Sequence, residues 1–201
     1  MKFYTNSLQP LHDPTNGLEI PNRITDILAF LDEKKLLTSI DTSNYDDLLI
    51  KLPPSDRDYI RALLKKIKEV KHGNCKQCNR WNYIHEHPQQ ELCKQCKADI
   101  TDPKNRYGYA DPYYQDTSCD SDTYNVLCNM LSCMQKALNE NIKDHSVYES
   151  DDFMMVTRPP GHHSSSNLAS GFCYINWAYL ISRYLFHNSK DANVCILDLD
   201  L

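Results

Sequence analysis

Two short segments carry the side chains best suited to catalysis. His162 and His163 follow a Pro-Pro-Gly turn inside the segment 158–173, and Asp198 and Asp200 are separated by one residue. On a strand, side chains at i and i+2 point to the same side, so two such carboxylates need a cation, a histidine or a shared proton. A histidine and a divalent metal would meet that need, and a metal-activated water would make this half of a hydrolase site. A histidine pair alone is weak evidence, so the hypothesis depends on the aspartates.

Each cluster follows a short apolar run that predicts a buried strand. The runs are residues 153–157 and 194–197, and residues 175–186 between them have the apolar spacing of a helix. This order predicts a βαβ unit with a parallel sheet and a right-handed crossover. Because ligands bind at the carboxyl ends of strands in such sheets, both clusters are expected at one edge of the sheet.

Apolar periodicity predicts three further helices, which places the chain in the α/β class. One helix begins at Asn22, one follows Pro53-Pro54 with Ser55 as its cap, and one covers about residues 122–139. Their predicted buried stripes are Ile24, Ile27, Leu28 and Leu31, then Ile60, Leu63, Leu64 and Ile67, and finally Leu127, Leu131, Met134 and Leu138. Residues 1–20 are polar and rich in turn formers, which predicts an irregular segment.

Composition limits the classes of protein to consider. The chain has 201 residues, of which 41% are hydrophobic and 24% are charged, as in ordinary globular proteins. Its net charge of −5 does not favour direct binding to nucleic acid or to an anionic membrane. No apolar run is long enough to span a membrane, and residues 1–6 lack the apolar core of a signal peptide. We therefore expect an intracellular protein, in the nucleus or the cytoplasm.

A cysteine-rich segment, residues 71–111, predicts a small structural zinc module. Cys75 and Cys78 form one Cys-x-x-Cys pair, Cys93 and Cys96 form a second, and fourteen residues separate the pairs. Four thiolates at this spacing are typical of a tetrahedral zinc-ribbon site. The alternative is four free thiols in a loop, which would leave this polar segment with few means of folding. The module would bind a protein, a peptide or nucleic acid, or stabilise local structure with no partner.

Three motifs in order and spacing resemble the zinc-dependent histone deacetylase and acetylpolyamine amidohydrolase family. They are Arg158-Pro-Pro-Gly-His-His163, Ser170-Gly-Phe-Cys-Tyr-Ile-Asn176 and Leu197-Asp-Leu-Asp-Leu201. The resemblance implies a three-layer α/β/α fold with a parallel sheet, arginase/deacetylase-like and incomplete here. Residues 1–70 and 112–201 would belong to the deacetylase domain, and residues 71–111 would be a zinc-ribbon-like insert.

The resemblance also implies a role for each matching residue. His163 would be the general base and later the acid, and His162 would be coupled to Asp198 through a hydrogen bond. Asp200 would be a ligand of the catalytic zinc, and the backbone near Asp198 and Asp200 would form part of a potassium site. Gly171 and Phe172 would be walls of the acyl-lysine tunnel. Asp116 would be the loop aspartate that holds the substrate backbone. The substrate would be an acyl-lysine, as on a histone tail, or an acetylpolyamine.

The sequence departs from the family pattern at its last residue, Leu201. In the family a histidine zinc ligand follows this position, and a further carboxylate ligand and a tyrosine come later. One protein ligand is too few for a catalytic zinc, which normally has three. We therefore expect the 201-residue chain to lack activity. It would be either part of a longer deacetylase or a non-catalytic remnant that presents the zinc-ribbon module to a protein partner.

Overall fold

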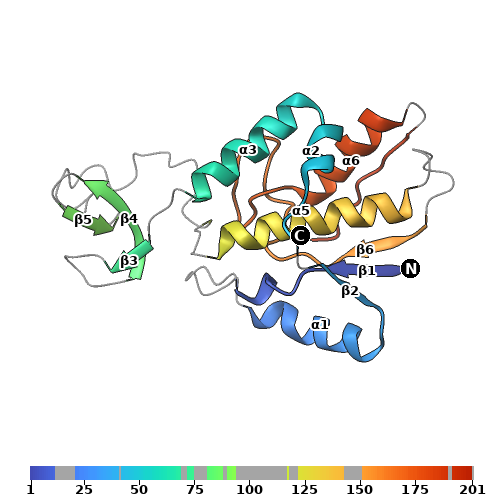
Figure 1. Ribbon diagram of the computed structural model, residues 1–201, viewed down its shortest axis with the longest axis horizontal. Coiled ribbons are helices and arrows are strands. Elements are labelled where there is room, and N and C mark those ends of the chain that lie inside the picture. The colour runs from blue at the N-terminus through green and yellow to red at the C-terminus, as the bar shows by residue number, and fades with distance from the viewer. Residues whose placement is uncertain are drawn as a thin grey trace.

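A parallel three-stranded sheet lies at the centre of the fold in the computed structural model (Figure 1). The structure describes residues 1–11, 21–40, 42–68, 72–74, 81–87, 90–93, 117, 122–142, 151–189 and 192–200. Strand β1 (Lys2–Thr5) pairs in parallel with β2 (Leu37–Ser39) on one side and with β6 (Phe153–Met155) on the other. The predicted α/β class and parallel sheet are therefore confirmed.

Strand β1 corrects the prediction that residues 1–20 are irregular. Residues 2–5 form the middle strand of the sheet, and Tyr4 is completely buried. A four-residue strand has only two side chains on each face, which is too few for an alternating pattern to stand out from a polar neighbourhood. A 3₁₀ turn, η1 (Gln9–Leu11), follows β1, and residues 12–20 lie outside the described part of the chain.

Helices cover both sides of this sheet, with α1 (Asn22–Glu33) on one side and α5 (Thr123–Asn141) on the other (Figure 1). Helix α1 begins at Asn22, although only Ile24 and Leu31 of its predicted stripe are buried. The predicted stripe of α5, namely Leu127, Leu131, Met134 and Leu138, is at most 1% exposed. Helix α5 is therefore the centre of the hydrophobic core. No helix within the described ranges is long and apolar enough to cross a membrane.

Three more helices pack around α5 or against one another. They are α2 (Asp46–Lys51), which the sequence did not predict, α3 (Pro54–Lys68) and α6 (Trp177–Asn188). The predicted stripe of α3 is buried, because Ile60, Leu63, Leu64 and Ile67 all belong to the core. Two residues of α6, Tyr179 and Arg183, contact Asp56 of α3, so these two helices are tied together by side chains. Helix α6 begins directly after the segment that carries the histidine pair.

The predicted strand at residues 194–197 is wrong. Residues 192–200 contain no strand, and Ile196, Leu197 and Leu199 are 53%, 79% and 84% exposed. An apolar run indicates a preference for burial, but it does not specify which strand will pair with it. Within the described residues β6 is an edge strand, and residues 192–200 do not pair with it. The predicted βαβ unit is therefore not formed there.

A second, antiparallel sheet lies within the cysteine-rich segment. Its strands are β3 (His72–Asn74), β4 (Trp81–His87) and β5 (Gln90–Cys93), in the order β3-β4-β5. Cys75, Cys78 and Cys96 lie outside the described residues, and of Cys93 only the backbone is described. The four-cysteine zinc site and the three-part division of the chain therefore stay predictions.

Candidate functional site

The structure brings the histidine pair and the two aspartates together. His162 Nδ1 lies 2.9 Å from Asp198 Oδ2, and His162 Nε2 lies 3.3 Å from Asp200 Oδ2. The contact arises although residues 192–200 form no strand. The Asp200 N–H donates a hydrogen bond of 3.1 Å to Asp198 Oδ1, which folds the two aspartates into an Asx turn around the imidazole. The residue types therefore predicted the cluster, while the backbone geometry differs from the expected one.

The carboxyl group of Asp198 is stabilised in its charged form. The backbone N–H of Asp200 and, after it, the His162 side chain hold the pKa of Asp198 below its usual value. A carboxylate that stays ionised is an acceptor for an imidazole N–H and fixes the orientation of the ring. His162 and Asp198 are thus arranged as a hydrogen-bonded dyad.

His163 is the member of the pair that is free to act. Its ring centroid is 4.0 Å from that of His162, and the two rings are tilted by 48°. The residue is exposed, and within the described ranges its ring nitrogens make no hydrogen bond. Water or a substrate can therefore reach them. A general base needs this accessibility, whereas the ring nitrogens of His162 are occupied by carboxylates.

A tight turn at residues 170–173 packs against His163. Gly171 and Phe172 both have positive φ, 55° and 64°, and Ser170 and Cys173 exchange backbone hydrogen bonds of 3.0 and 2.9 Å. This is the conformation of a two-residue type I′ turn. A Cβ atom on Gly171 would lie 2.6 Å from three carbon atoms of His163. The absence of a side chain at Gly171 is therefore what allows the turn to touch the histidine.

Phe172 adopts a backbone conformation that is unfavourable for a bulky residue. Its N–H donates a hydrogen bond of 3.0 Å to Oγ1 of Thr117, and Thr117 is 1% exposed. This bond helps to hold Phe172 in the turn. No motif singled out Thr117, because a lone threonine has no distinctive spacing. Its neighbour Asp116, the predicted substrate-loop aspartate, lies outside the described residues.

Side chains also fix the backbone of the histidine segment. The amide nitrogen of Asn176 donates to the carbonyls of His162 and Ser164, at 3.5 and 3.0 Å, and Ser170 Oγ donates to the carbonyl of His163 at 2.6 Å. Three consecutive carbonyls are therefore bound by side chains. Asn176 belongs to the motif at residues 170–176, but nothing in that motif indicates these backbone partners.

The Pro-Pro-Gly turn before the histidines packs against the start of α6. Trp177 Nε1 donates to the Pro159 carbonyl at 3.1 Å, and a Cβ atom on Gly161 would lie 2.8–2.9 Å from backbone atoms of Ile175 and Trp177 and from the Trp177 ring. A larger residue than glycine would push this turn away from the helix. The histidine segment therefore packs against the first turn of α6.

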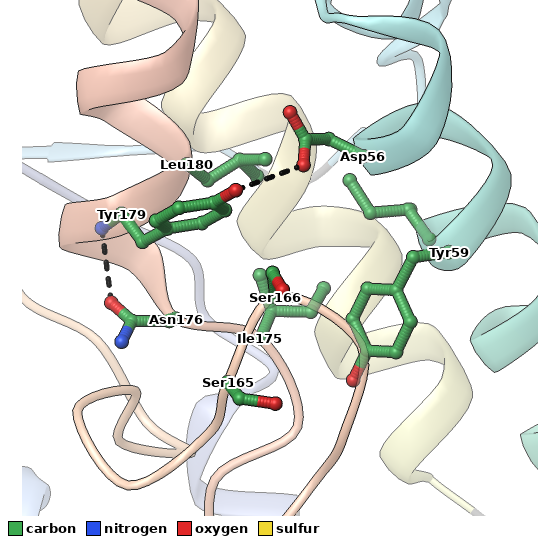
Figure 2. Close-up of a pocket in the computed structure, with 9 residues that line it drawn as sticks. Asp56, Tyr59, Ser165, Ser166, Ile175, Asn176, Tyr179 and Leu180 are labelled. Carbon is green, nitrogen blue, oxygen red and sulfur yellow. Dashed lines mark hydrogen bonds between the residues drawn. The ribbon is translucent and has the colours of Figure 1, made fainter.

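A small pocket lies between the first turn of α6 and α3, and its lining includes neither histidine (Figure 2). Figure 2 shows the Tyr179 hydroxyl pointing to Asp56, to which it donates a hydrogen bond of 3.3 Å. Arg183 Nε donates to the other oxygen of the same buried carboxylate at 2.8 Å. The pocket is thus bounded in part by Asp56 and Tyr179, whose hydrogen bond joins α6 to α3.

The described residues do not form a zinc site by themselves. No three His, Cys, Asp or Glu side chains within the described ranges are placed to hold one metal ion. Asp200 is the carboxylate predicted to bind zinc, and its Oδ2 contacts His162. Carboxylate oxygens suit zinc as donors, but a catalytic zinc normally needs three protein ligands.

Comparison with known proteins points to one family. A family model described as "Histone deacetylase domain" matches residues 18–201. The chain is 30% identical over 84 residues to Histone deacetylase 6 of Caenorhabditis elegans, a match that covers 40% of this chain and 8% of that protein. It is 27% identical over 113 residues to Histone deacetylase HOS3 of Saccharomyces cerevisiae, covering 55% of this chain and 16% of that protein.

A bacterial relative that is not named as a histone deacetylase also matches. The chain is 43% identical over 46 residues to an Acetylpolyamine amidohydrolase of Burkholderia pseudomallei, which covers 23% of this chain and 13% of that protein. The chain thus spans less than a fifth of the length of each of these three relatives.

Proposed function

Because the chain belongs to the histone deacetylase family, we propose that it supplies the histidine half of a site that hydrolyses the amide bond of an acylated amine. The observation that carries the proposal is the geometry around His162, which lies 2.9 Å from Asp198 and beside an accessible His163. An oriented dyad next to a free imidazole is suited to moving a proton onto and off a reacting group.

We assign the proton transfers to His163. Its nitrogen removes a proton from the attacking water, and the same nitrogen then donates that proton to the leaving amine as the carbon–nitrogen bond breaks. This assignment uses one group as base and then as acid, so the reaction needs no net change in the protonation of the enzyme. The contact with Gly171 fixes where the ring can lie.

His162 and Asp198 support His163 electrostatically. Asp198 keeps the His162 ring oriented, and His162 lies close enough to influence the charge that develops on its neighbour. Removing the Asp198 charge would disturb both the orientation of His162 and the field at His163. We therefore assign Asp198 a role in orienting and stabilising the pair, without direct contact with the substrate.

For the substrate we propose an acyl-lysine side chain, such as that of an acetylated histone tail, or an acetylpolyamine. Gly171 and Phe172 would form one wall for the methylene chain, because a flat apolar surface suits an alkyl stem. Asp116 would hold the substrate backbone. Both candidate substrates carry an acetylated primary amine on an alkyl chain, which is the chemistry that such a wall would recognise.

We propose that the 201-residue chain on its own turns over substrate slowly or not at all. Asp200 is our candidate zinc ligand, and we place the other ligands outside the described residues because no described group of three could hold a metal. A backbone potassium site near Asp198 and Asp200, an intracellular location in the nucleus or cytoplasm, and a protein partner for the 71–111 module also remain proposals.

The test is acetate release by the native protein that carries this chain. An ε-N-acetyl-lysine peptide and an N-acetylpolyamine are supplied separately, and Asp198→Asn is compared with the wild type. Hydrolysis of either substrate that falls by about 10–10²-fold in Asp198→Asn supports the proposal, since misplacing catalytic groups by about 1 Å costs up to about 10²-fold. No hydrolysis of either substrate, or full activity in the variant, would overturn it.

A second candidate is a non-catalytic remnant that presents the cysteine-rich module to a protein. It is favoured by the separate antiparallel sheet β3-β4-β5 within the cysteine-rich segment. Zinc analysis separates the two candidates. One zinc per chain that is lost in Cys75→Ser, together with no amidase activity in the native protein, would favour the remnant.

A further inference from the structure

We infer that Asn176 is a positioning residue that fixes the backbone of the histidine pair to the start of helix α6. The inference rests on the proposed catalytic role of His163 and adds a residue to which that proposal gives no role. It is carried by the different contacts that the two ends of the Asn176 amide group make.

The oxygen of the Asn176 side chain caps helix α6. It accepts a hydrogen bond of 3.0 Å from the N–H of Tyr179, as Figure 2 shows, and satisfies one of the donors left free in the first turn of the helix. This function is purely structural. Aspartate performs it as well as asparagine, because both side chains present an acceptor oxygen at the same position.

The nitrogen of the same side chain serves the site. It donates to the carbonyl of Ser164 at 3.0 Å and to that of His162 at 3.5 Å, which are the residues on either side of His163. The His162 carbonyl belongs to the peptide group directly before His163, and the Ser164 carbonyl belongs to the peptide group directly after Ser164. The two bonds therefore hold the backbone on both sides of His163, while Ser170 holds the peptide group between His163 and Ser164. An aspartate at position 176 has no N–H to donate and would lose both contacts.

Helix α6 is held firmly enough to act as a reference point. Tyr179 and Arg183 on α6 donate to the buried carboxylate of Asp56 on α3, and Trp177 donates to the Pro159 carbonyl. Because the histidine segment is hydrogen-bonded to α6, its position is fixed relative to both α3 and α6. Without the side-chain N–H of Asn176, the segment keeps the hydrogen bonds from Trp177 to the Pro159 carbonyl and from Ser170 to the His163 carbonyl. It loses the hydrogen bonds to the carbonyls of His162 and Ser164, which lie between those two points of attachment or next to them.

The test compares Asn176→Asp with Asn176→Ala and Asn167→Asp. Asn176→Asp keeps the cap and removes the donors, whereas Asn176→Ala removes both. Asn167→Asp is the matched control, because it introduces the same charge in the same loop and, among the described residues, its Oδ1 accepts a hydrogen bond from Ser165 alone. The first measurement is hydrogen–deuterium exchange of residues 159–166 by mass spectrometry, which does not depend on enzymatic activity.

We expect exchange in residues 159–166 to be faster in both Asn176 variants and unchanged in Asn167→Asp. Asn176→Asp should melt above Asn176→Ala, because it retains the cap. Unchanged exchange in Asn176→Asp would overturn the inference, because it would leave Asn176 with a capping role only.

The second measurement is steady-state kinetics of the native protein that carries this chain. We expect kcat to fall about 10–100-fold in Asn176→Asp with KM within about twofold, because misplacing a catalytic group by about 1 Å costs up to about 10²-fold. Equal kcat in Asn176→Asp and Asn167→Asp would also overturn the inference. If the wild type shows no amidase activity, the proposed function fails, and the exchange experiment still decides the role of Asn176.

Discussion

Replacing Gly171 with alanine would place a methyl group where the His163 side chain lies. The new Cβ atom would be 2.6 Å from Cβ, Cγ and Cδ2 of His163, and the backbone at this position has φ of +55°. Carbon atoms in contact are separated by about 3.5–4.0 Å. The turn or the ring must therefore move by about 1 Å, in addition to the strain of a left-handed conformation at a residue with a side chain.

Both effects can be expressed as free energies of unfolding. The left-handed conformation costs about 1–2 kcal/mol for a residue other than glycine, and forcing an extra carbon into a packed site costs about 1–3 kcal/mol. The total is about 2–5 kcal/mol, or a fall in Tm of roughly 5–15 °C for a chain of this size. Activity should fall by up to about 10²-fold, because His163 is displaced.

Lys35 provides a matched control for the backbone part of this cost. It has φ of +56°, close to that of Gly171, and it is exposed just after the end of α1. Lys35→Gly removes the same strain in an open position and should stabilise the protein by about 1 kcal/mol. The loss in Gly171→Ala beyond that gain measures the contact with His163.

The assay is urea unfolding of the 201-residue chain at neutral pH, followed by circular dichroism. The reasoning is refuted if Gly171→Ala destabilises the chain by no more than Lys35→Gly stabilises it, since no steric contribution from His163 would then remain. Acetate release by the native protein with the same substitution provides the corresponding measurement of function.

Three further predictions concern the residues around the site and in the core. Thr117→Val removes the acceptor of the Phe172 N–H and should lower the free energy of unfolding by about 1–3 kcal/mol. Thr117→Ser keeps the hydroxyl and should retain most of that stability. Equal losses for the two variants in urea unfolding would contradict the role of the hydroxyl. Burial raises the pKa of the Cys133 thiol to about 12 while Cys195 is exposed, so peptide mapping should find that iodoacetamide labels Cys195 in the folded chain and Cys133 only after unfolding. Hydrogen bonds from Lys136 and Tyr4 lower the pKa of Glu140, so its stabilising effect is present above the pKa of the unfolded chain and is lost as pH falls through the folded-state value. Glu140→Gln should therefore destabilise the chain modestly at about pH 7, and the difference should shrink toward about pH 3; a difference that grows on acidification would contradict the assignment.

Long periodic segments and residue types were sufficient to predict a large part of this fold. Helix α5 was predictable because Leu127, Leu131, Met134 and Leu138 recur on one helical face over several turns. Strand β1 was missed because four residues, even with a completely buried Tyr4, carry almost no periodic signal. The strand predicted at residues 194–197 was wrong because an apolar run does not specify a pairing partner.

Some contacts of the candidate site could also be predicted from the sequence, and others could not. Charge predicted a histidine partner for the two carboxylates without choosing between His162 and His163, and the family resemblance implied the hydrogen bond between His162 and Asp198. Asn176 and Thr117 could not be assigned from sequence. Their partners are backbone groups of residues 12 to 55 positions away in the chain, and folding alone brings them together.

The central claim is that His163 performs the proton transfers of an amide hydrolase. The most direct measurement is kcat for acetate release from an ε-N-acetyl-lysine peptide, or from an N-acetylpolyamine if that is the better substrate, by the native protein and by its His163→Gln variant. Our account predicts a fall in kcat of about 10²–10⁴-fold with an unchanged circular dichroism spectrum. A folded His163→Gln variant that keeps kcat within a few-fold of the wild type would contradict it.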